Sequence, residues 1–569
     1  MATIHTILKE LRDNATSQRD LGDKLERLIK KYLLTDPQYA DKLSNVWLWM
    51  EWEGRGNKID TGIDLVAKER GTGEYWAIQC KFYEPTHTLQ KSDIDSFFTA
   101  SGQRFSTSDG EYYFSQRLIV STTDKWSSKA ENALSDQQIP VSRLRVEDLD
   151  QSKVDWSQFS LTKLDDMPLL PKKTLRDHQV EALTKTKEGF ETSDRGKLIM
   201  ACGTGKTFTS LRIAEQVTPK NGRILFLAPS ISLVSQTLRE WTAEANNPIH
   251  AFVVCSDTKV GKDTEDIRTH DLAYPATTDP NKLAQHAKAG VLSSDRRTVI
   301  FSTYQSIQVV ADAQQDSGLG DFDLIICDEA HRTTGITLSD GNASDFVKVH
   351  DQDVIRGKKR LYMTATPRIY AEASKTKAGR HDATLYSMDD EDVYGTEFYR
   401  LGFGKAVELD LLSEYKVLIV ATNEDKMISI ANQYNAYKLD SKKAIDTEFA
   451  LKIIGSWKGL SKQGLMQIGD DGEQEPLDAD ISPMRRAVAF SRTIKASEAT
   501  TDTFSTLVDM YKETHEDNDS SAMTDCTLRH VDGKMNALQR QNSLEWLKAE
   551  PDSNECRVLS NAEGVKYFV

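Results

Sequence analysis

Long apolar runs are missing from this chain of 569 residues: none approaches the roughly 20 residues that a membrane-spanning helix needs. The first residues, MATIHTILKELRDN, are polar and amphipathic and lack the apolar core of a signal peptide. Cysteine is scarce, with six scattered residues and no CxxC pair, which argues against a disulfide framework. These absences predict a protein of the reducing cytoplasm that has no membrane association.

A surplus of positive charge is also missing. Lys and Arg number 72 against 87 Asp and Glu, which gives a net charge of −15. This balance excludes nucleic-acid binding over the whole surface, so any DNA contact must come from a local basic lining of a groove. The sequence has no internal repeats, and its length predicts about two to four domains.

The sequence divides into three blocks. Residues 1–162 begin with a helical apolar pattern and continue with the short β-like runs IDLVAK, YWAIQCKFY and RLIVSTT. Residues 163–375 alternate helices with the apolar strand candidates KLIMA, RILFLAP, AFVVCS, TVIFST, DLIICDE and RLYMTAT. Residues 376–569 begin with an acidic, Tyr-rich connector and continue with YKVLIVAT, RRAVAFSRT, CTLRHVDG and CRVLSNA. The pattern predicts an α/β protein whose second block is a doubly wound parallel sheet that binds ligands beyond its strand ends, followed by a second α/β domain that is cut short.

The most informative of these strand ends carries MACGTGKT at residues 200–207, followed by the helical run TFTSLRIAEQV. A strand, a tight glycine turn and a helix start together form an anion site. Backbone N–H groups of Gly203, Thr204 and Gly205 would face the triphosphate of ATP. Lys206 would reach its β- and γ-phosphates, and Thr207 would offer a hydroxyl to Mg²⁺. Met200 stands where the usual GxxxxGK[ST] pattern has its first glycine, and a plain glycine turn is the alternative interpretation.

A second phosphate-site motif, ICDEAHR, follows at residues 326–332. Asp328 comes directly after an apolar strand, where it can hold Mg²⁺, and Glu329 is then placed to orient and deprotonate the attacking water. The alternative is a surface helix that begins with acidic residues. The position of Asp328 directly after the apolar run argues against it.

With these motifs the chain resembles a superfamily 2 helicase or translocase motor. LRDHQVEAL resembles its Q-motif, which makes Arg176 and Gln179 candidates for the adenine side of the nucleotide site. APSISLVSQ, STYQS, TAT and AFSRT resemble motifs Ia, Ib, III and IV in family order. The resemblance implies two RecA-like lobes that clamp ATP and grip a nucleic-acid backbone. It makes four hydroxyl residues candidates for phosphate-backbone contacts, with helix capping or turn formation as the alternative: Ser230, Ser232, Thr303 and Thr364.

The last residues depart from that family. RVLSNA resembles the start of motif V and EGV its later part, but several residues between them are missing, and no motif VI with its arginine finger follows. An arginine finger accelerates phosphoryl transfer by orders of magnitude. This end predicts a truncated reading frame or a fragment, with impaired ATP hydrolysis when the chain acts alone.

The first block carries a candidate nuclease centre. Asp64 lies in GIDLVAK, and Gln79 and Lys81 lie in AIQCKFY. Residues i and i+2 of a strand project to the same side, so Gln79 and Lys81 would point together, with Asp64 facing them from a neighbouring strand. Asp64 and a backbone carbonyl near Cys80 could ligate Mg²⁺, and Lys81 could activate water or stabilise the charge that develops on a phosphodiester. The alternative is a half-buried strand with ordinary alternating polar residues.

The D…QxK pattern resembles the Mrr-like branch of the PD-(D/E)xK nucleases, in which Gln often replaces Glu. Glu26, in LGDKLERL, matches the helix-borne acidic residue of that family. The surrounding sequence, placed before a DNA motor, favours the nuclease interpretation.

A nuclease followed by such a motor resembles the first part of the type ISP restriction–modification enzymes, and so does the stretch DVYGTEFYRLGFGKAVELDLLSEYKVLIV. The resemblance implies ATP-driven translocation along double-stranded DNA and Mg²⁺-dependent cleavage. The chain has no NPPY-type methylation motif and no candidate AdoMet glycine loop, so we expect a separate methyltransferase and target-recognition chain. Two alternatives stay open. One is a repair or RNA-directed helicase whose first domain only binds nucleic acid, and the other is an inactive remnant or subunit that binds ATP and DNA.

Overall fold

The structure of the protein is a computed structural model, and it forms two compact units, Met1–Ser413 and Glu414–Val569. The residues that it describes are 3–58, 62–108, 110–135, 137–163, 166–256, 268–291, 296–338, 344–372, 383–414, 424–437, 445–462, 466–468, 474–476, 482–514, 524–532, 535, 537–552 and 554–562. Among the helices in these ranges, none is both long and apolar enough to cross a membrane.

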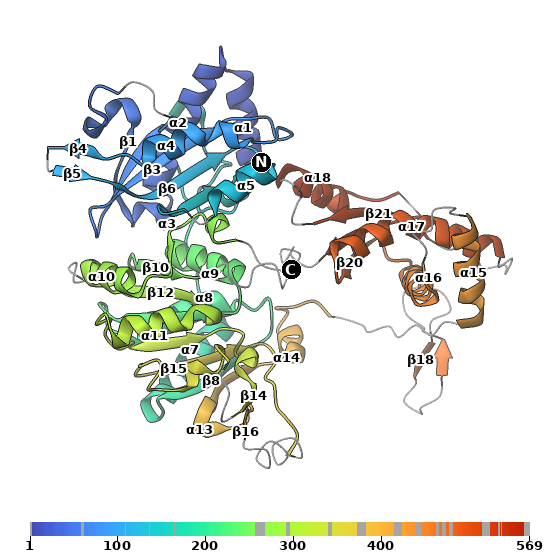
Figure 1. The fold of residues 1–569 in the computed structure, drawn as a ribbon. Coiled ribbons are helices and arrows are strands. Elements are labelled where there is room, and N and C mark those ends of the chain that lie inside the picture. The colour runs from blue at the N-terminus through green and yellow to red at the C-terminus, as the bar shows by residue number, and fades with distance from the viewer. Residues whose placement is uncertain are drawn as a thin grey trace. The chain divides into compact units, whose positions relative to one another are not determined.

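The first unit opens with a five-stranded mixed sheet (Figure 1) in the order β1-β2-β3-β6-β7. The first three strands are antiparallel, and β6 and β7 continue the sheet parallel to β3. The strands are β1 (Leu43–Leu48), β2 (Leu65–Glu69), β3 (Tyr75–Lys81), β6 (Phe114–Ser121) and β7 (Val141–Leu144), with a small hairpin of β4 (Phe105–Thr107) and β5 (Gly110–Tyr112). The three β-like runs predicted in the first block are therefore strands of one sheet.

Helix α2 (Gln18–Thr35) packs on this sheet against β1 and β3. The Ser17 hydroxyl caps its first turn, as expected of a serine before an apolar periodic run. The predicted apolar stripe is buried: Leu21, Leu25, Leu28, Ile29 and Leu33. The other helices of this part are α1 (Ile4–Asp13), α3 (Pro37–Ala40), α4 (Asp95–Ser101), α5 (Ser128–Leu134) and α6 (Val146–Asp150).

An eight-stranded sheet follows, in the order β11-β10-β12-β9-β13-β15-β8-β17, and all its neighbouring strands are parallel. The strands are β8 (Arg195–Met200), β9 (Arg223–Ala228), β10 (His250–Val254), β11 (Ala276–Thr277), β12 (Thr298–Thr303), β13 (Leu324–Cys327), β15 (Arg360–Thr364) and β17 (Thr396–Leu401). All six strands predicted for the second block are confirmed. The predicted boundary at residue 375 stays a prediction. Beyond it, β17 joins the sheet at its edge beside β8.

Helices cover both faces of this sheet, as a doubly wound fold requires. Side chains of β9 alternate between the two resulting cores: Phe226 packs with Trp241 of α9, and Leu225 packs with Ile307 of α11. The helices are α7 (Asp177–Thr192), α8 (Lys206–Val217), α9 (Ile231–Glu244), α10 (Pro280–Val291), α11 (Ile307–Gln315), α13 (Glu391–Tyr394) and α14 (Phe403–Glu408), and a hairpin pairs β14 (Gly335–Leu338) with β16 (Ala383–Tyr386).

The two sheets of the first unit are joined by buried polar contacts. Lys153, which follows the first sheet, lies 2.5 Å from Glu244 of α9, and both side chains are about nine-tenths buried. Arg143 of β7 pairs with Asp271. Because a buried charge needs a partner, these pairs hold the five-stranded sheet against the eight-stranded one.

The second unit contains a parallel three-stranded sheet, β20-β22-β21. Its strands are β20 (Arg486–Ser491), β21 (Asp525–Val531) and β22 (Glu555–Ala562), its helices are α15 (Glu424–Tyr437), α16 (Thr447–Ser461), α17 (Ile494–Thr514) and α18 (Ala537–Lys548), and a hairpin pairs β18 (Met466–Ile468) with β19 (Gln474–Pro476). The runs RRAVAFSRT, CTLRHVDG and CRVLSNA supply the three strands. YKVLIVAT, at residues 415–422, and EGV, at 563–565, lie outside the described residues.

Candidate nuclease and nucleotide sites

The predicted phosphate loop connects the end of β8 to the start of α8. Gly203 and Gly205 have φ values of +82° and +85°, a left-handed backbone that glycine adopts without strain. Thr204 is buried, and its hydroxyl donates to the carbonyl of Ala201 at 2.7 Å. Lys206 and Thr207 then form the first turn of α8. The loop therefore places the helix N-terminus, with its unpaired N–H groups, at the strand end, where it can bind an anion.

The predicted adenine-side residues reach this loop from α7. The side-chain oxygen of Gln179 accepts from the Arg176 N–H at 2.9 Å, and its amide nitrogen donates to the Gly205 carbonyl at 3.4 Å. A Cβ atom on Gly205 would lie only 2.4 Å from that nitrogen. His178, which sequence reasoning assigned no role, contacts the Thr204 carbonyl at 2.9 Å. Helix α7 therefore holds the phosphate loop in place through contacts with two of its carbonyl groups.

Asp328 and Glu329 follow β13, on the same edge of the sheet as the loop. The Lys206 Nζ atom lies 3.6 Å from Glu329 Oε1, so side chains of the two motifs meet. Burial, reinforced by the charge of Glu329, raises the pKa of Asp328 to about 6. Burial also favours the neutral form of Glu329, but a hydrogen bond from His331 and the charge of Lys206 outweigh it and lower the pKa of Glu329. The lowered pKa keeps Glu329 ionised at neutral pH.

Glu329 also occupies a strained backbone position, with φ of +49°. Non-glycine residues rarely adopt this conformation, and it costs of the order of 1–2 kcal/mol. His331 links this residue to the next strand, because its Nδ1 lies 3.3 Å from Glu329 Oε2 and 3.0 Å from Thr364 Oγ1. Sequence reasoning missed this role, although the histidine is part of the DEAH motif.

The four hydroxyl residues proposed as DNA contacts are all described. Ser230 caps α9 through a hydrogen bond from the Leu233 N–H, which is the alternative given above. Thr303 is 4% exposed and bonds to Ser306, and Thr364 is fully buried. Ser232 lies in the first turn of α9. The hydroxyls of Thr303 and Thr364 therefore bond to other residues of the same fold.

At the candidate nuclease centre, Asp64 contacts the predicted strand β3. Its Oδ2 accepts from the backbone N–H of Cys80 at 2.7 Å, between the two predicted residues Gln79 and Lys81. The Gln79 amide nitrogen donates to the Gly62 carbonyl at 2.9 Å. Its Oε1 atom is buried and has no hydrogen-bond partner within the described ranges, although burying such an atom without one is costly.

Burial and nearby charges both affect the pKa of the Cys80 thiol. Burial raises the pKa of Cys80, the nearby charges of Asp64 and Glu26 raise it further, and Lys81 opposes them. Glu26 lies on α2, the helix that packs on β3. The oxygen atoms of this region include the Asp64 carboxylate, the Gln79 amide oxygen and the backbone carbonyl of Cys80. A hard cation such as Mg²⁺ prefers this donor set.

Comparison with known proteins matches two regions of the chain to known families. Residues 34–166 match the family described as "Restriction endonuclease", and residues 172–369 match "Type III restriction enzyme, res subunit". Proteins of such helicase and nuclease families generally use ATP and a divalent metal ion.

Individual relatives agree with these matches. The chain is 34% identical to the ATP-dependent type ISP restriction–modification enzyme LlaBIII, in a structure bound to DNA, with a TM-score of 0.77 over 100% of this chain and 35% of that enzyme. It is 28% identical over 248 residues to the probable helicase A859L of African swine fever virus (isolate Tick/Malawi/Lil 20-1/1983), covering 43% of this chain and 24% of that protein. It is 29% identical over 259 residues to the type I restriction enzyme EcoAI endonuclease subunit of Escherichia coli, covering 44% of this chain and 25% of the subunit.

The matched region spans about a quarter of each curated relative and about a third of LlaBIII. The chain therefore carries a restriction-endonuclease domain followed by a helicase domain of the kind found in type III restriction enzymes, and it is similar over its whole length to part of a type ISP restriction–modification enzyme.

Proposed function

We propose that the chain is an ATP-driven motor on double-stranded DNA fused to a Mg²⁺-dependent DNA endonuclease, acting in the cytoplasm as part of a restriction–modification system. The motor assignment is supported chiefly by the contact between Lys206 and Glu329, which lie 3.6 Å apart at the strand ends of a parallel sheet. DNA as the partner is supported by the DNA-bound type ISP relative.

In the nucleotide site Lys206 would bind the β- and γ-phosphates, the turn from Gly203 to Gly205 would offer its N–H groups, and Thr207 and Asp328 would hold Mg²⁺. When bound, Mg²⁺ would neutralise part of the negative charge of the phosphates. Glu329 orients the attacking water and accepts its proton. Gln179 and Arg176 would hold the adenine side.

In the nuclease site Asp64, the Gln79 amide oxygen and the Cys80 carbonyl would hold Mg²⁺, which supplies Lewis-acid activation of the phosphodiester. Gln79 Oε1, which is buried and has no hydrogen-bond partner among the described residues, supports this set. Lys81 stabilises the negative charge that develops on the phosphate. Glu26 adds a second carboxylate near the attacking water.

Point variants of the full chain test the two sites separately. We expect Asp64→Ala and Lys81→Ala to lose Mg²⁺-dependent cleavage of duplex DNA while the exposed control Lys129→Ala retains it. Glu329→Gln should lower ATP turnover about 10²–10⁴-fold, the contribution of a positioned general base, and the exposed control Glu191→Gln should not. Undiminished cleavage in both nuclease variants would refute the nuclease assignment, and undiminished hydrolysis in Glu329→Gln would refute the motor.

The substrate and the partners need a further comparison. Cleavage of duplex DNA, but not of single-stranded DNA or RNA, supports a restriction nuclease, whereas binding of all three without cleavage supports a repair or RNA-directed helicase. We also propose that methylation and target recognition come from a separate chain or a further segment. If so, DNA-stimulated ATPase activity of this chain should show no dependence on the DNA sequence.

A further inference from the structure

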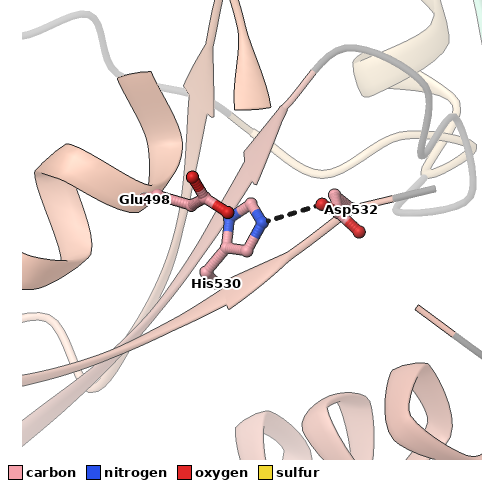
Figure 2. Close-up of side chains that lie close together, drawn as sticks. All are labelled: Glu498, His530 and Asp532. Atoms are coloured by element: carbon pink, nitrogen blue, oxygen red, sulfur yellow. Dashed lines mark ion pairs between the residues drawn. The ribbon is translucent and has the colours of Figure 1, made fainter. Parts of the chain in front are cut away.

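Three potential metal ligands gather in the second unit, whereas the nuclease and nucleotide residues all belong to the first. Figure 2 shows Glu498 on α17 beside His530 and Asp532 at the end of β21. One ligand atom from each residue lies within 4.8 Å of the others. The helix α17 follows β20, which runs parallel to β21 in the same sheet. The cluster therefore lies at the carboxyl edge of the sheet, where α/β folds bind ligands.

The imidazole of His530 is held in one orientation by two buried serines. Ser497 Oγ lies 2.7 Å from His530 Nδ1 and 2.8 Å from Ser560 Oγ. Both serine side chains are fully buried, and Ser560 is the register partner of His530 on β22. When Nδ1–H donates to Ser497 Oγ and that hydroxyl donates to Ser560, the Nε2 atom keeps its lone pair. Metal-binding histidines generally have such a second partner, which fixes the tautomer and the ring.

The Nε2 atom itself is buried and makes no hydrogen bond of acceptable geometry to any described residue. It nevertheless lies 3.2 Å from Asp532 Oδ2. The other carboxylate oxygen, Oδ1, accepts from the Met535 N–H at 3.1 Å, so the carboxylate is also held. Two fixed acceptor atoms that face each other need a cation between them or a proton on the ring.

We propose that Glu498, His530 and Asp532 bind a divalent transition-metal ion of the zinc class. An imidazole nitrogen combined with carboxylate oxygens suits Zn²⁺, Co²⁺ and Mn²⁺, whereas Mg²⁺ prefers oxygen ligands alone. Three protein ligands leave at least one coordination position for water or for an oxygen of a ligand. The ion would also tie α17 to β21. This site rests on neither the nuclease nor the motor assignment.

The test uses the full chain titrated with Co²⁺ or Zn²⁺ alone, with metal counted per chain and Co²⁺ followed by its visible absorption. We expect His530→Gln to lose one equivalent of bound metal and the Co²⁺ bands that belong to it. Glu498→Gln should do the same, and because Glu498 is exposed, this variant cannot fail merely by misfolding. The matched control is Glu513→Gln, an exposed residue of the same helix, which should bind metal as the parent does. Metal bound elsewhere in the chain is the same in the parent and in every variant, so it does not affect the difference in bound metal between them.

Ser497→Ala supplies an independent readout, because it removes the partner of Nδ1 without removing a ligand. We expect metal affinity to fall about 10–100-fold, the usual effect of losing such a partner. If Glu498→Gln, His530→Gln and Ser497→Ala all bind as many equivalents as the control with the same affinity, the proposal is overturned and His530 and Asp532 form an ion pair with a proton between them.

Discussion

Asp36 offers the sharpest test of a buried charge beside Lys153, which joins the five-stranded sheet to the eight-stranded sheet. It follows α2 and is only 4% exposed. Its Oδ1 accepts from the Gln38 N–H at 3.0 Å, which caps α3, and its Oδ2 accepts from the Lys153 N–H at 3.2 Å. Burial raises the pKa of this carboxyl from its ordinary value of 3.8 to about 6, because these hydrogen bonds compensate the lost hydration only in part.

The sign of the pH effect follows from proton binding in the two states. Between pH 3.8 and about 6 the folded chain keeps a proton on Asp36 that the unfolded chain has released, so stability falls as pH rises through this window. The contribution is fully present below pH 3.8 and is lost above about 6. The difference between the two pKa values corresponds to about 3 kcal/mol of unfolding free energy.

The perturbation is Asp36→Asn, which stays neutral at every pH and still caps a helix well. The asparagine loses the bond from the Lys153 N–H, and this constant cost of about 1 kcal/mol is independent of pH. The informative quantity is therefore the difference between parent and variant as a function of pH. We expect the variant to gain about 2.5 kcal/mol on the parent between pH 4 and 7.

The assay is the thermal unfolding midpoint of the first unit across this pH range. For a unit that spans Met1–Ser413, 1 kcal/mol shifts the midpoint by only about 1 °C, so the difference should change by about 3 °C. Asp23→Asn, at an exposed position of α2, is the control and should follow the parent. A parent-minus-variant difference that stays constant with pH would refute the reasoning, because it would mean that the buried carboxyl titrates normally.

Further predictions concern the nucleotide loop and the buried charges. Gly205→Ala should weaken binding of a fluorescent ATP analogue at least about tenfold, because the residue has φ of +85° and the added Cβ would lie 2.4 Å from a neighbouring side chain. Gly22→Ala, in a helix with open space around it, should leave nucleotide binding unchanged. His331→Ala should retain ATP binding but lower turnover about tenfold or more, since Glu329 loses its orienting partner; equal turnover would contradict this role. Lys42→Met should destabilise the first unit by about 3–5 kcal/mol in thermal or urea unfolding, because its buried partner carboxylate is left unpaired; a loss below about 1 kcal/mol would show that the pair is solvated.

Much of the nucleotide site could be predicted because its elements are local. The glycine turn, Lys206 and Thr207 are consecutive, and Asp328 with Glu329 directly follows an apolar strand. In a parallel sheet all carboxyl strand ends lie on one edge, so the two motifs had to meet once the strands were recognised. Strand β17 was not predicted because it lies at a sheet edge, where half of its residues are exposed, and it shows no apolar run. It pairs with β8, which lies about two hundred residues earlier.

The sequence by itself determined the order of the two domains, the phosphate loop and the acidic pair after β13, because each is a short pattern whose chemistry depends on neighbouring residues. Only the tertiary structure decided that Gln179 holds the loop and that His331 joins Glu329 to Thr364, since these contacts bridge separate elements. It also decided that Gln79 Oε1 is buried without a partner in the described residues and that Glu498 meets His530 and Asp532. Distances between side chains that are far apart in sequence arise from packing, and no local pattern records them.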